Sequence, residues 1–184
     1  MNLLRRSQGR FQNGHNDAGA ARRRARMVAS DETGVRIEGS NAYHWVFRCK
    51  AAVVHHAAPS RAALVVREVM DGHRPEAWLS DRYSAQQGHG LVQQTCLAHL
   101  ARDVAYAVEG GDDPVAFRLK LWIGSVFALA DRITDLAAST LAAKRRALER
   151  SLTNILAAPT SCDLARDIQR RFRRARGQLL IFAD

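Results

Sequence analysis

The sequence has few of the features that mark secreted and membrane-embedded proteins. Its 184 residues include only three cysteines, Cys49, Cys96 and Cys162, which are widely spaced and odd in number. This pattern excludes a disulfide framework and predicts a reducing, cytoplasmic environment. The longest apolar stretch, around residues 121–130, is too short to span a bilayer, and the basic residues 1–10 are not followed by the apolar run of a signal peptide. We therefore expect a bacterial cytoplasmic protein, associated with the nucleoid and without membrane contact.

Acidic residues are scarce beside basic ones. The chain carries 28 Lys and Arg against 18 Asp and Glu, a formal net charge of +10. A positive charge of this size favours nucleic acid as a partner. Residues 1–26 contain glycines that break any helical periodicity and end in Arg22, Arg23 and Arg24, so we expect a flexible basic arm, either solvated or laid along DNA.

The middle of the chain alternates as strands do. Residues 27–39 predict a first strand, with a turn at Gly39-Ser40-Asn41, and residues 43–47 and 51–56 predict two more. A helix is expected from Pro59 to Gly72, and residues 77–80 predict a fourth strand that returns parallel to the sheet. The predicted order is β-β-β-α-β, followed by a helix over residues 96–108.

The last third of the chain predicts helices only. Asp112-Asp113-Pro114 is typical of a helix start, and an apolar stripe runs from Val115 to Leu136. Two further helices are expected, over residues 141–155 and 164–179. We predict an α/β fold with three regions: the arm (1–26), a core (27–111) and a helical extension or insertion (112–184).

Two aspartates follow predicted strands. Asp31 comes after the first apolar segment, and Asp81 comes directly after the fourth strand. If these strands are neighbours, both carboxylates lie at one edge of the sheet, where they can share divalent cations for phosphoryl transfer. The spacing alone fits turn or capping residues as well.

The short sequence motifs around these aspartates indicate a protein family more specifically than the spacing of the aspartates does. They occur in the order Asp31-Glu32-Thr33-Gly34, His44-Trp45-Val46-Phe47, Pro59-Ser60-Arg61, Ser80-Asp81-Arg82-Tyr83 and Cys96-Leu97-Ala98-His99-Leu100-Ala101-Arg102. This series resembles the IS66-type insertion-sequence transposases of the DDE group, over residues 27–184. The resemblance implies a ribonuclease-H-like core that acts in DNA transposition and recombination.

What the resemblance implies for the site follows residue by residue. Asp31 and Asp81 match the first two catalytic carboxylates and would hold Mg²⁺ or Mn²⁺, with Glu32, His99 and Arg102 as supporting neighbours. The family's third carboxylate, a glutamate after an Asn-Asn pair, has no counterpart here. We therefore expect a truncated chain, without its leader and DNA-binding module, that binds metal weakly and is inactive alone.

Several alternatives stay open. Cys96 and His99 have the spacing of half a zinc site, but no second pair accompanies them, and His55-His56 fits a strand end better than a ligand pair. The chain can also be a non-catalytic nucleic-acid binder or a decayed gene product, and it can self-associate. Double-stranded DNA (element ends and target) is the expected partner. The expected DNA contacts are Arg22, Arg23, Arg24, Arg61, Arg170, Arg171, Arg173 and Arg174.

Overall fold

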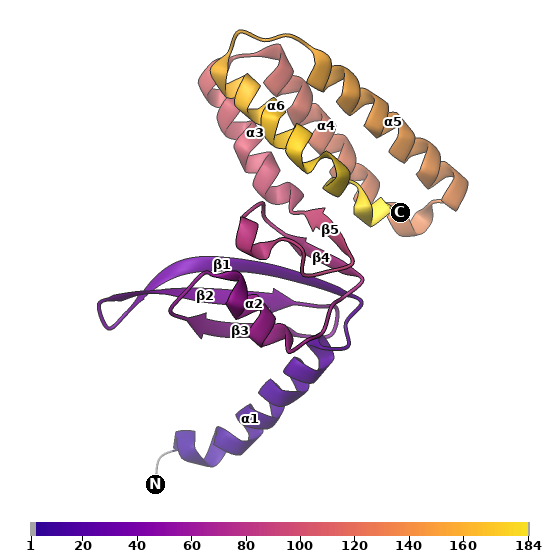
Figure 1. Cartoon of the computed structure of the whole chain (residues 1–184). Helices are drawn as coiled ribbons and strands as arrows, with labels where there is room; N and C mark the ends of the chain where they lie inside the picture. Colours follow the sequence, from indigo (N-terminus) through magenta and orange to yellow (C-terminus); the bar gives the residue numbers. More distant parts are fainter. Residues whose placement is uncertain (1–2, 184) are drawn as a thin grey trace. The chain divides into compact units, whose positions relative to one another are not determined.

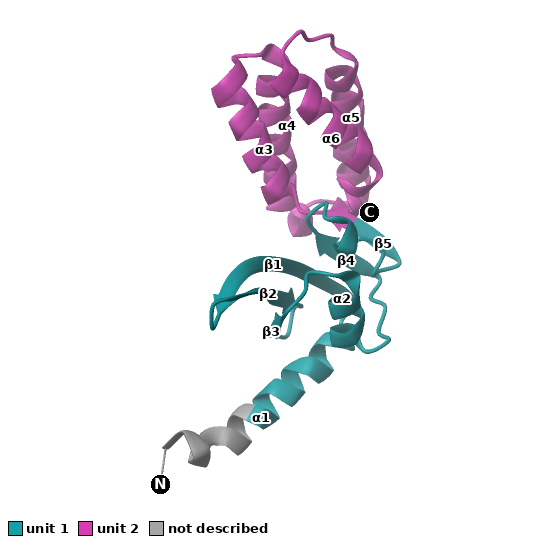
Figure 2. Ribbon diagram, turned by 60° about the vertical axis from the view of Figure 1, so that its left-hand side comes forward, with its two compact units in different colours: residues 1–93 teal, residues 94–184 magenta. Residues whose placement is uncertain are grey.

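The computed structural model describes residues 3–183 and contains two compact units, each described here by itself (Figure 2). The sheet unit ends at Gln93, and the helical unit begins at Gln94. The fold is mixed α/β, as expected. Within the described residues, no helix is both long and apolar enough to cross a membrane.

The first four strands of a mixed five-stranded sheet follow the predicted β-β-β-α-β order. In Figure 1 the strands β1 (Met27–Ile37), β2 (Ser40–Arg48) and β3 (Val53–Ala58) form an antiparallel meander. Helix α2 (Ala63–Met70) then returns the chain to β4 (Ala77–Ser80), which pairs parallel to β1. The order is β3-β2-β1-β4-β5. The first strand is therefore central and the fourth lies beside it, as the argument about the aspartates required.

The fifth strand, β5 (Val92–Thr95), was not predicted. Its sequence Val-Gln-Gln-Thr has neither an apolar run nor an apolar-polar alternation. The backbone N–H groups of Leu91 and Val92 donate to the carbonyls of Pro75 and Glu76. These hydrogen bonds are made with the segment that leads into β4, so they depend on the chain fold and not on a local pattern.

The turn between β1 and β2 lies one residue earlier than predicted. Glu38 and Gly39 both have positive φ, +50° and +80°, and Ile37 pairs directly with Ser40. A two-residue loop with positive φ at both positions is the turn that matches the twist of a hairpin. Ser40 and Asn41, expected in the turn, are instead the first residues of β2.

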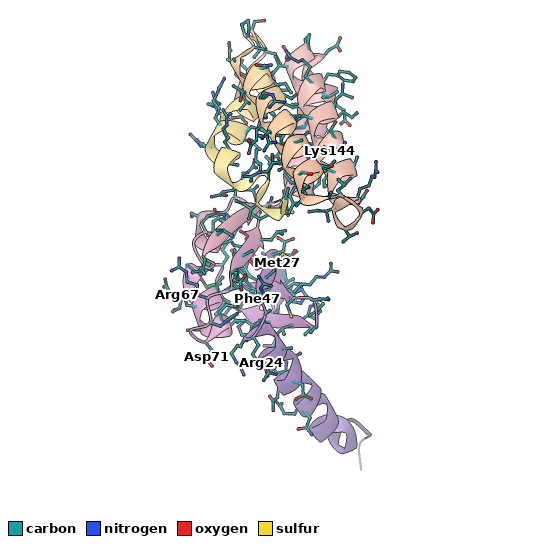
Figure 3. All side chains as sticks on the ribbon, turned by 90° about the vertical axis from the view of Figure 1, so that its right-hand side faces the viewer. Arg24, Met27, Phe47, Arg67, Asp71 and Lys144 are labelled. Carbon is teal, nitrogen blue, oxygen red and sulfur yellow. The ribbon has the colours of Figure 1, made fainter. Side chains whose placement is uncertain are left out.

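The core of the sheet unit lies between one sheet face and α2. Val28, Trp45, Phe47 and Trp78 contribute fully buried side chains from the strands, and α2 contributes Val66. Figure 3 labels Phe47 inside this unit. Successive side chains of a strand point to opposite faces, so the even-numbered residues of β1 share this buried face. Asp31 therefore projects from the opposite face.

The basic arm contains a helix where we expected none. Helix α1 spans Leu3–Arg22, and its end is anchored, because Ala18 and Ala25 pack against the core and the Arg22 guanidinium donates to the Val69 carbonyl. Residues 1 and 2 of the expected arm lie outside the described residues. Glycine lowers helix propensity by only about 1 kcal/mol per residue, so tertiary packing can outweigh it.

The helical unit consists of four helices around one core. They are α3 (Leu97–Gly111), α4 (Pro114–Ala130), α5 (Ala138–Ala157) and α6 (Asp163–Ala175). Packing groups α3 with these helices, whereas the sequence analysis placed it with the strands. Asp113 caps α4 as predicted, since its Oδ1 accepts from the Val115 N–H at 2.8 Å. The predicted stripe to Leu136 is interrupted, because α4 ends at Ala130.

Candidate active site

Asp31 lies within β1 and not after it. The strand continues to Ile37, and Asp31 pairs with Val46 of β2. Its side chain is exposed, and its Oδ1 accepts one hydrogen bond, from the backbone N–H of Glu32 at 3.0 Å. An exposed carboxylate with one short-range contact keeps lone pairs for an external ligand.

Asp81 stands immediately after β4 in a tightly bonded turn. Its Oδ1 accepts from the backbone N–H of Tyr83 at 2.9 Å, the local bond that Asp side chains make in turns. Its backbone carbonyl accepts from Gln87 Nε2 at 2.8 Å and from the Ser80 hydroxyl at 3.0 Å. Both the backbone and one carboxylate oxygen of Asp81 are thus fixed by neighbouring groups.

Asp31 lies on β1 and Asp81 directly follows β4, and these two strands are neighbours in the sheet. In the parallel pair of β1 and β4, Val28 pairs with Trp78 and Ala29 with Leu79. Continuing this register by two residues places Asp31 beside Asp81 on adjacent strands. Neighbouring strands lie about 4.8 Å apart, so a register continued in this way would place the two carboxylates near each other, and their sharing one site stays a prediction.

Glu32 occupies the opposite face of β1 from Asp31. Its side chain is only 3% exposed, and its carboxylate accepts from the Arg61 guanidinium and from Gln86 Nε2. Burial raises the pKa of Glu32, the Arg61 hydrogen bond lowers it, and the negative charge of Asp81 raises it. Burial is the largest of these effects and the net pKa is raised. The negative charge of Asp81 therefore affects the pKa of Glu32, although Glu32 lies on the interior face of the sheet.

A buried polar network supports the Asp81 turn from below. Gln86 is completely buried and makes three hydrogen bonds to two strands: its amide donates to Glu32 of β1, its Oε1 accepts from the Ser30 hydroxyl of β1, and its carbonyl accepts from the Ser80 hydroxyl of β4 at 3.1 Å. Gln93 Nε2 donates to Ser80 at 3.0 Å. These hydrogen bonds connect β1, which carries Asp31, with β4 and the loop that carries Asp81. The network therefore holds the two strands together.

Arg61, expected to contact DNA, is held inside this site. Its guanidinium donates to Glu32 and stacks over the Tyr83 ring at 3.9 Å from the ring centroid, with the Tyr43 ring at 5.8 Å. The Glu32 hydrogen bond raises the pKa of Arg61. Its side chain is 43% exposed, so one side of the cation still reaches solvent. Arg61 ties the loop before α2 to the loop after β4.

Changing Glu32 to glutamine should alter how stability depends on pH. Because the folded-state pKa of Glu32 is raised above its ordinary value of 4.5, the folded state keeps a proton that the unfolded state has released. The free-energy contribution of Glu32 is therefore full at low pH and is lost as pH rises through the folded pKa. Urea unfolding in pH steps should show the wild-type stability, relative to Glu32→Gln, falling over this window. Exposed Glu38→Gln is the control, and a Glu32→Gln difference that stays constant with pH would contradict the prediction.

The two remaining neighbours predicted for the site belong to α3 in the helical unit. His99 is half-buried, and its Nδ1 is enclosed without a hydrogen-bond partner. Arg102 is exposed on the same helix. Among the described residues, no group of three or more His, Cys, Asp or Glu side chains is placed to hold a metal ion. The expected support from His99 and Arg102 therefore stays a prediction.

Most arginines expected to bind DNA already have partners within the protein. Arg22 is 5% exposed and bonded to Val69, an arrangement that argues against a phosphate contact. Arg170 pairs with Asp167 at 2.8 Å, and Arg171 pairs with Asp167 and Asp103 at 2.8 and 3.1 Å. The remaining side chains are exposed: Arg23, Arg24, Arg173 and Arg174.

Arg173 differs from the other exposed arginines, because it also donates to the Leu156 carbonyl. Its exposed position therefore does not leave the whole guanidinium available to an external phosphate.

Two participants in the site, and one residue outside it, were not identified as functional candidates from the sequence. Gln86 and Tyr83 lie in the loop after β4, and their roles depend on contacts with β1 and Arg61. His44 was noted only as part of a motif, yet it contacts His55 across β2 and β3. A cross-strand alignment of the two predicted strands is the signal that could have found this contact.

Comparison with known protein families identifies the family of this chain. A family model described as "Transposase IS66 family" matches residues 1–182, which is essentially the whole chain. No curated protein and no solved structure matches.

Proposed function

Because the chain belongs to the IS66 family of transposases, we propose that it carries part of the catalytic centre for DNA transposition, with Asp31 and Asp81 as its metal-binding carboxylates. Membership of this family implies an interaction with DNA. The observation that supports the proposal most directly is the parallel pairing of β1 with β4, because its register, continued by two residues, would set Asp31 beside Asp81. The proposed chemistry is phosphodiester hydrolysis and strand transfer on double-stranded DNA, within a ribonuclease-H-like core.

The carboxylate oxygens of Asp31 and Asp81 are suitable ligands for a hard divalent cation, but they supply only part of its coordination. Asp31 uses one oxygen in a single backbone hydrogen bond, and Asp81 uses one oxygen to accept from Tyr83. Each carboxylate keeps an oxygen for Mg²⁺ or Mn²⁺, which prefer oxygen ligands and retain several waters. A cation held there would stabilise the negative charge that develops on a phosphoryl group during displacement.

Glu32, Gln86 and Arg61 act as positioning residues in this proposal. They lie on the interior side of β1 and connect it to the loop that carries Asp81. Precise placement matters because loss of about 1 Å in positioning can cost about 100-fold in rate. The network therefore contributes by holding two carboxylates at a fixed spacing and not by contacting the substrate.

We further propose that the chain by itself does not cut DNA. Two carboxylates hold a metal pair loosely, and the described residues supply no third acidic or imidazole ligand beside them. DNA contact would come from exposed arginines, with Arg23 and Arg24 at the end of α1 and Arg174 on α6 as the foremost candidates. Arg24 is labelled in Figure 3.

Calorimetric titration with Mn²⁺ tests the metal site. We expect weak binding that is lost in Asp31→Asn and in Asp81→Asn, since each change removes one of two charged ligands. Asp71→Asn, which alters an exposed carboxylate at the end of α2, is the matched control and should bind as the wild type does. Binding that survives both Asp31→Asn and Asp81→Asn would rule out this site.

A plasmid-nicking assay tests the expected inactivity. Supercoiled DNA incubated with the purified chain and Mn²⁺ should remain intact. Metal-dependent nicking that Asp31→Ala abolishes would show that two carboxylates suffice, or that a third ligand is recruited. Nicking that Asp31→Ala leaves unchanged would indicate a contaminating nuclease.

A further inference from the structure

Two histidines on neighbouring strands contact each other on the sheet face that carries Asp31. His55 Nδ1 of β3 lies 3.0 Å from His44 Nε2 of β2. The rings are nearly parallel, with an interplanar angle of 8° and centroids 5.0 Å apart. His55 pairs with Val46, two residues along β2 from His44, so the contact is a diagonal cross-strand pair.

The separation of the two ring nitrogens is that of a hydrogen bond, and it is also short enough for one metal ion to reach both nitrogens. Metal–nitrogen bonds of about 2.0–2.1 Å that meet at about 90–97° span the observed 3.0 Å between ring nitrogens. A tetrahedral angle of about 109° would require a separation nearer 3.3–3.4 Å. Because the rings turn when they bind an ion, this separation does not fix the angle, and the choice of metal rests on the affinity of imidazole for Cu²⁺ and Ni²⁺, of which Cu²⁺ binds the more tightly.

The surroundings leave room for such an ion. His55 is exposed and His44 is half-buried, so solvent reaches the pair and water can complete the coordination. The rings now share a hydrogen bond, and rotation of each about its Cβ–Cγ bond turns both lone pairs toward a common point. His56, the next residue along β3, points to the other face and pairs with Trp45.

This pair is separate from the carboxylate site. Val46 lies between Asp31 and His55 in the row across β1, β2 and β3. The ligand chemistry also differs, because imidazole favours borderline transition metals whereas carboxylates favour Mg²⁺ and Mn²⁺. One sheet face thus presents two kinds of metal ligand on adjacent strands.

We propose that His44 and His55 form a two-histidine site for a transition-metal ion, Cu²⁺ or Ni²⁺, on the Asp31 face of the sheet. The remaining coordination positions are filled by water or by an external ligand. Cu²⁺ binds more tightly than Ni²⁺, following the general order of divalent metals at nitrogen sites. Because the ion joins β2 to β3, its binding also stabilises the meander.

Titration of the full chain with Cu²⁺ and with Ni²⁺, followed by calorimetry, tests the proposal. The variants His44→Ala and His55→Ala should each lose affinity by about tenfold or more, equivalent to about 1.4 kcal/mol. His56→Ala is the matched control, because it removes the neighbouring imidazole from the other face, and it should bind as the wild type does. The wild-type midpoint of thermal unfolding should rise with Ni²⁺, whereas that of the double variant His44→Ala/His55→Ala should not.

Each other outcome is decisive. Equal Cu²⁺ and Ni²⁺ affinity in the wild type and the double variant would overturn the proposal and leave the pair as a hydrogen bond only. An affinity loss in His56→Ala equal to that in His55→Ala would place the ion elsewhere and overturn it too. Ni²⁺ binding retained in Asp31→Asn and Asp81→Asn is expected, and it separates this site from the carboxylate site.

Discussion

Trp45→Ala should lower the free energy of unfolding of the sheet unit by about 3–5 kcal/mol, the range typical of removing a fully buried aromatic side chain. The Trp45 side chain is 0% exposed, stacks with Phe47 at 5.9 Å between centroids and donates to the Ser60 carbonyl at 3.1 Å. The substitution therefore leaves a cavity beneath β2 and frees the loop that carries Arg61. Urea unfolding followed by circular dichroism measures the loss.

The variant Trp45→Phe separates the contribution of the buried aromatic ring from that of the hydrogen bond to the Ser60 carbonyl. Phenylalanine keeps most of the buried area but cannot donate to Ser60, so about 1 kcal/mol for the hydrogen bond and a small cavity remain to be lost. The two variants should therefore differ by several-fold in their effect. Equal, small effects of Trp45→Ala and Trp45→Phe would mean that the indole is not buried as described.

Gly90→Ala is expected to destabilise the same unit by about 1–3 kcal/mol or more, as overpacking of a filled site does. A Cβ at position 90 would stand 2.8 Å from the backbone nitrogen and 2.9 Å from the Cβ of Trp78. Backbone cannot rotate away as a flexible side chain can, so β4 has to shift. The displacement also moves Asp81 at the end of β4, and weaker Mn²⁺ binding should accompany the lower stability.

Gly34→Ala is the matched control for this effect. Gly34 lies in β1, and a Cβ added there meets no atom within 4 Å. Its replacement should be neutral or slightly stabilising, because alanine has less conformational freedom to lose on folding. Urea unfolding followed by circular dichroism measures the stability of both variants. A Gly90→Ala protein as stable as Gly34→Ala would disprove the close approach.

The order of strands was predictable from the sequence because alternation and parallel crossovers follow general rules. Val35 and Ile37 of β1 alternate with polar residues, β2 and β3 are short runs with aromatic or β-branched residues, and a helix before β4 is typical of a parallel return. These rules left the adjacency of the first and fourth strands as a condition for bringing Asp31 and Asp81 together, and the observed strand order meets that condition. The rules could not predict β5, whose Gln-rich sequence owes its place to backbone hydrogen bonds with the segment before β4.

The supporting part of the site was less predictable. Gln86 was indistinguishable from a surface residue in a polar loop, yet it is completely buried. Its partners Ser30 and Glu32 lie more than fifty residues away in the chain, at separations of 56 and 54. Local patterns carry no information on such contacts. The carboxylates were predicted, whereas the network that positions them required the fold.

The contacts of the arginines were also only partly predictable from the sequence. Their number predicted a basic surface, but Arg170 and Arg171 each pair with Asp167 one turn away on α6, and Arg171 also reaches Asp103 on α3. The pairs within α6 could have been read from the spacing of three and four residues. The contact between helices could not, because it depends on how α3 and α6 pack.

Asp31 and Glu32 are consecutive in the chain but have opposite surroundings, one in solvent and one beside Gln86 and Arg61. Which carboxylate has which role depends on whether its position in β1 is odd or even. Inserting or deleting a single residue between Met27 and Ser30 would exchange them, turning the carboxylate that is now buried outward and the exposed one inward. A change of two residues would preserve this parity while shifting the carboxylates along the strand. Strand β1 should therefore tolerate point substitution far better than any change in its length.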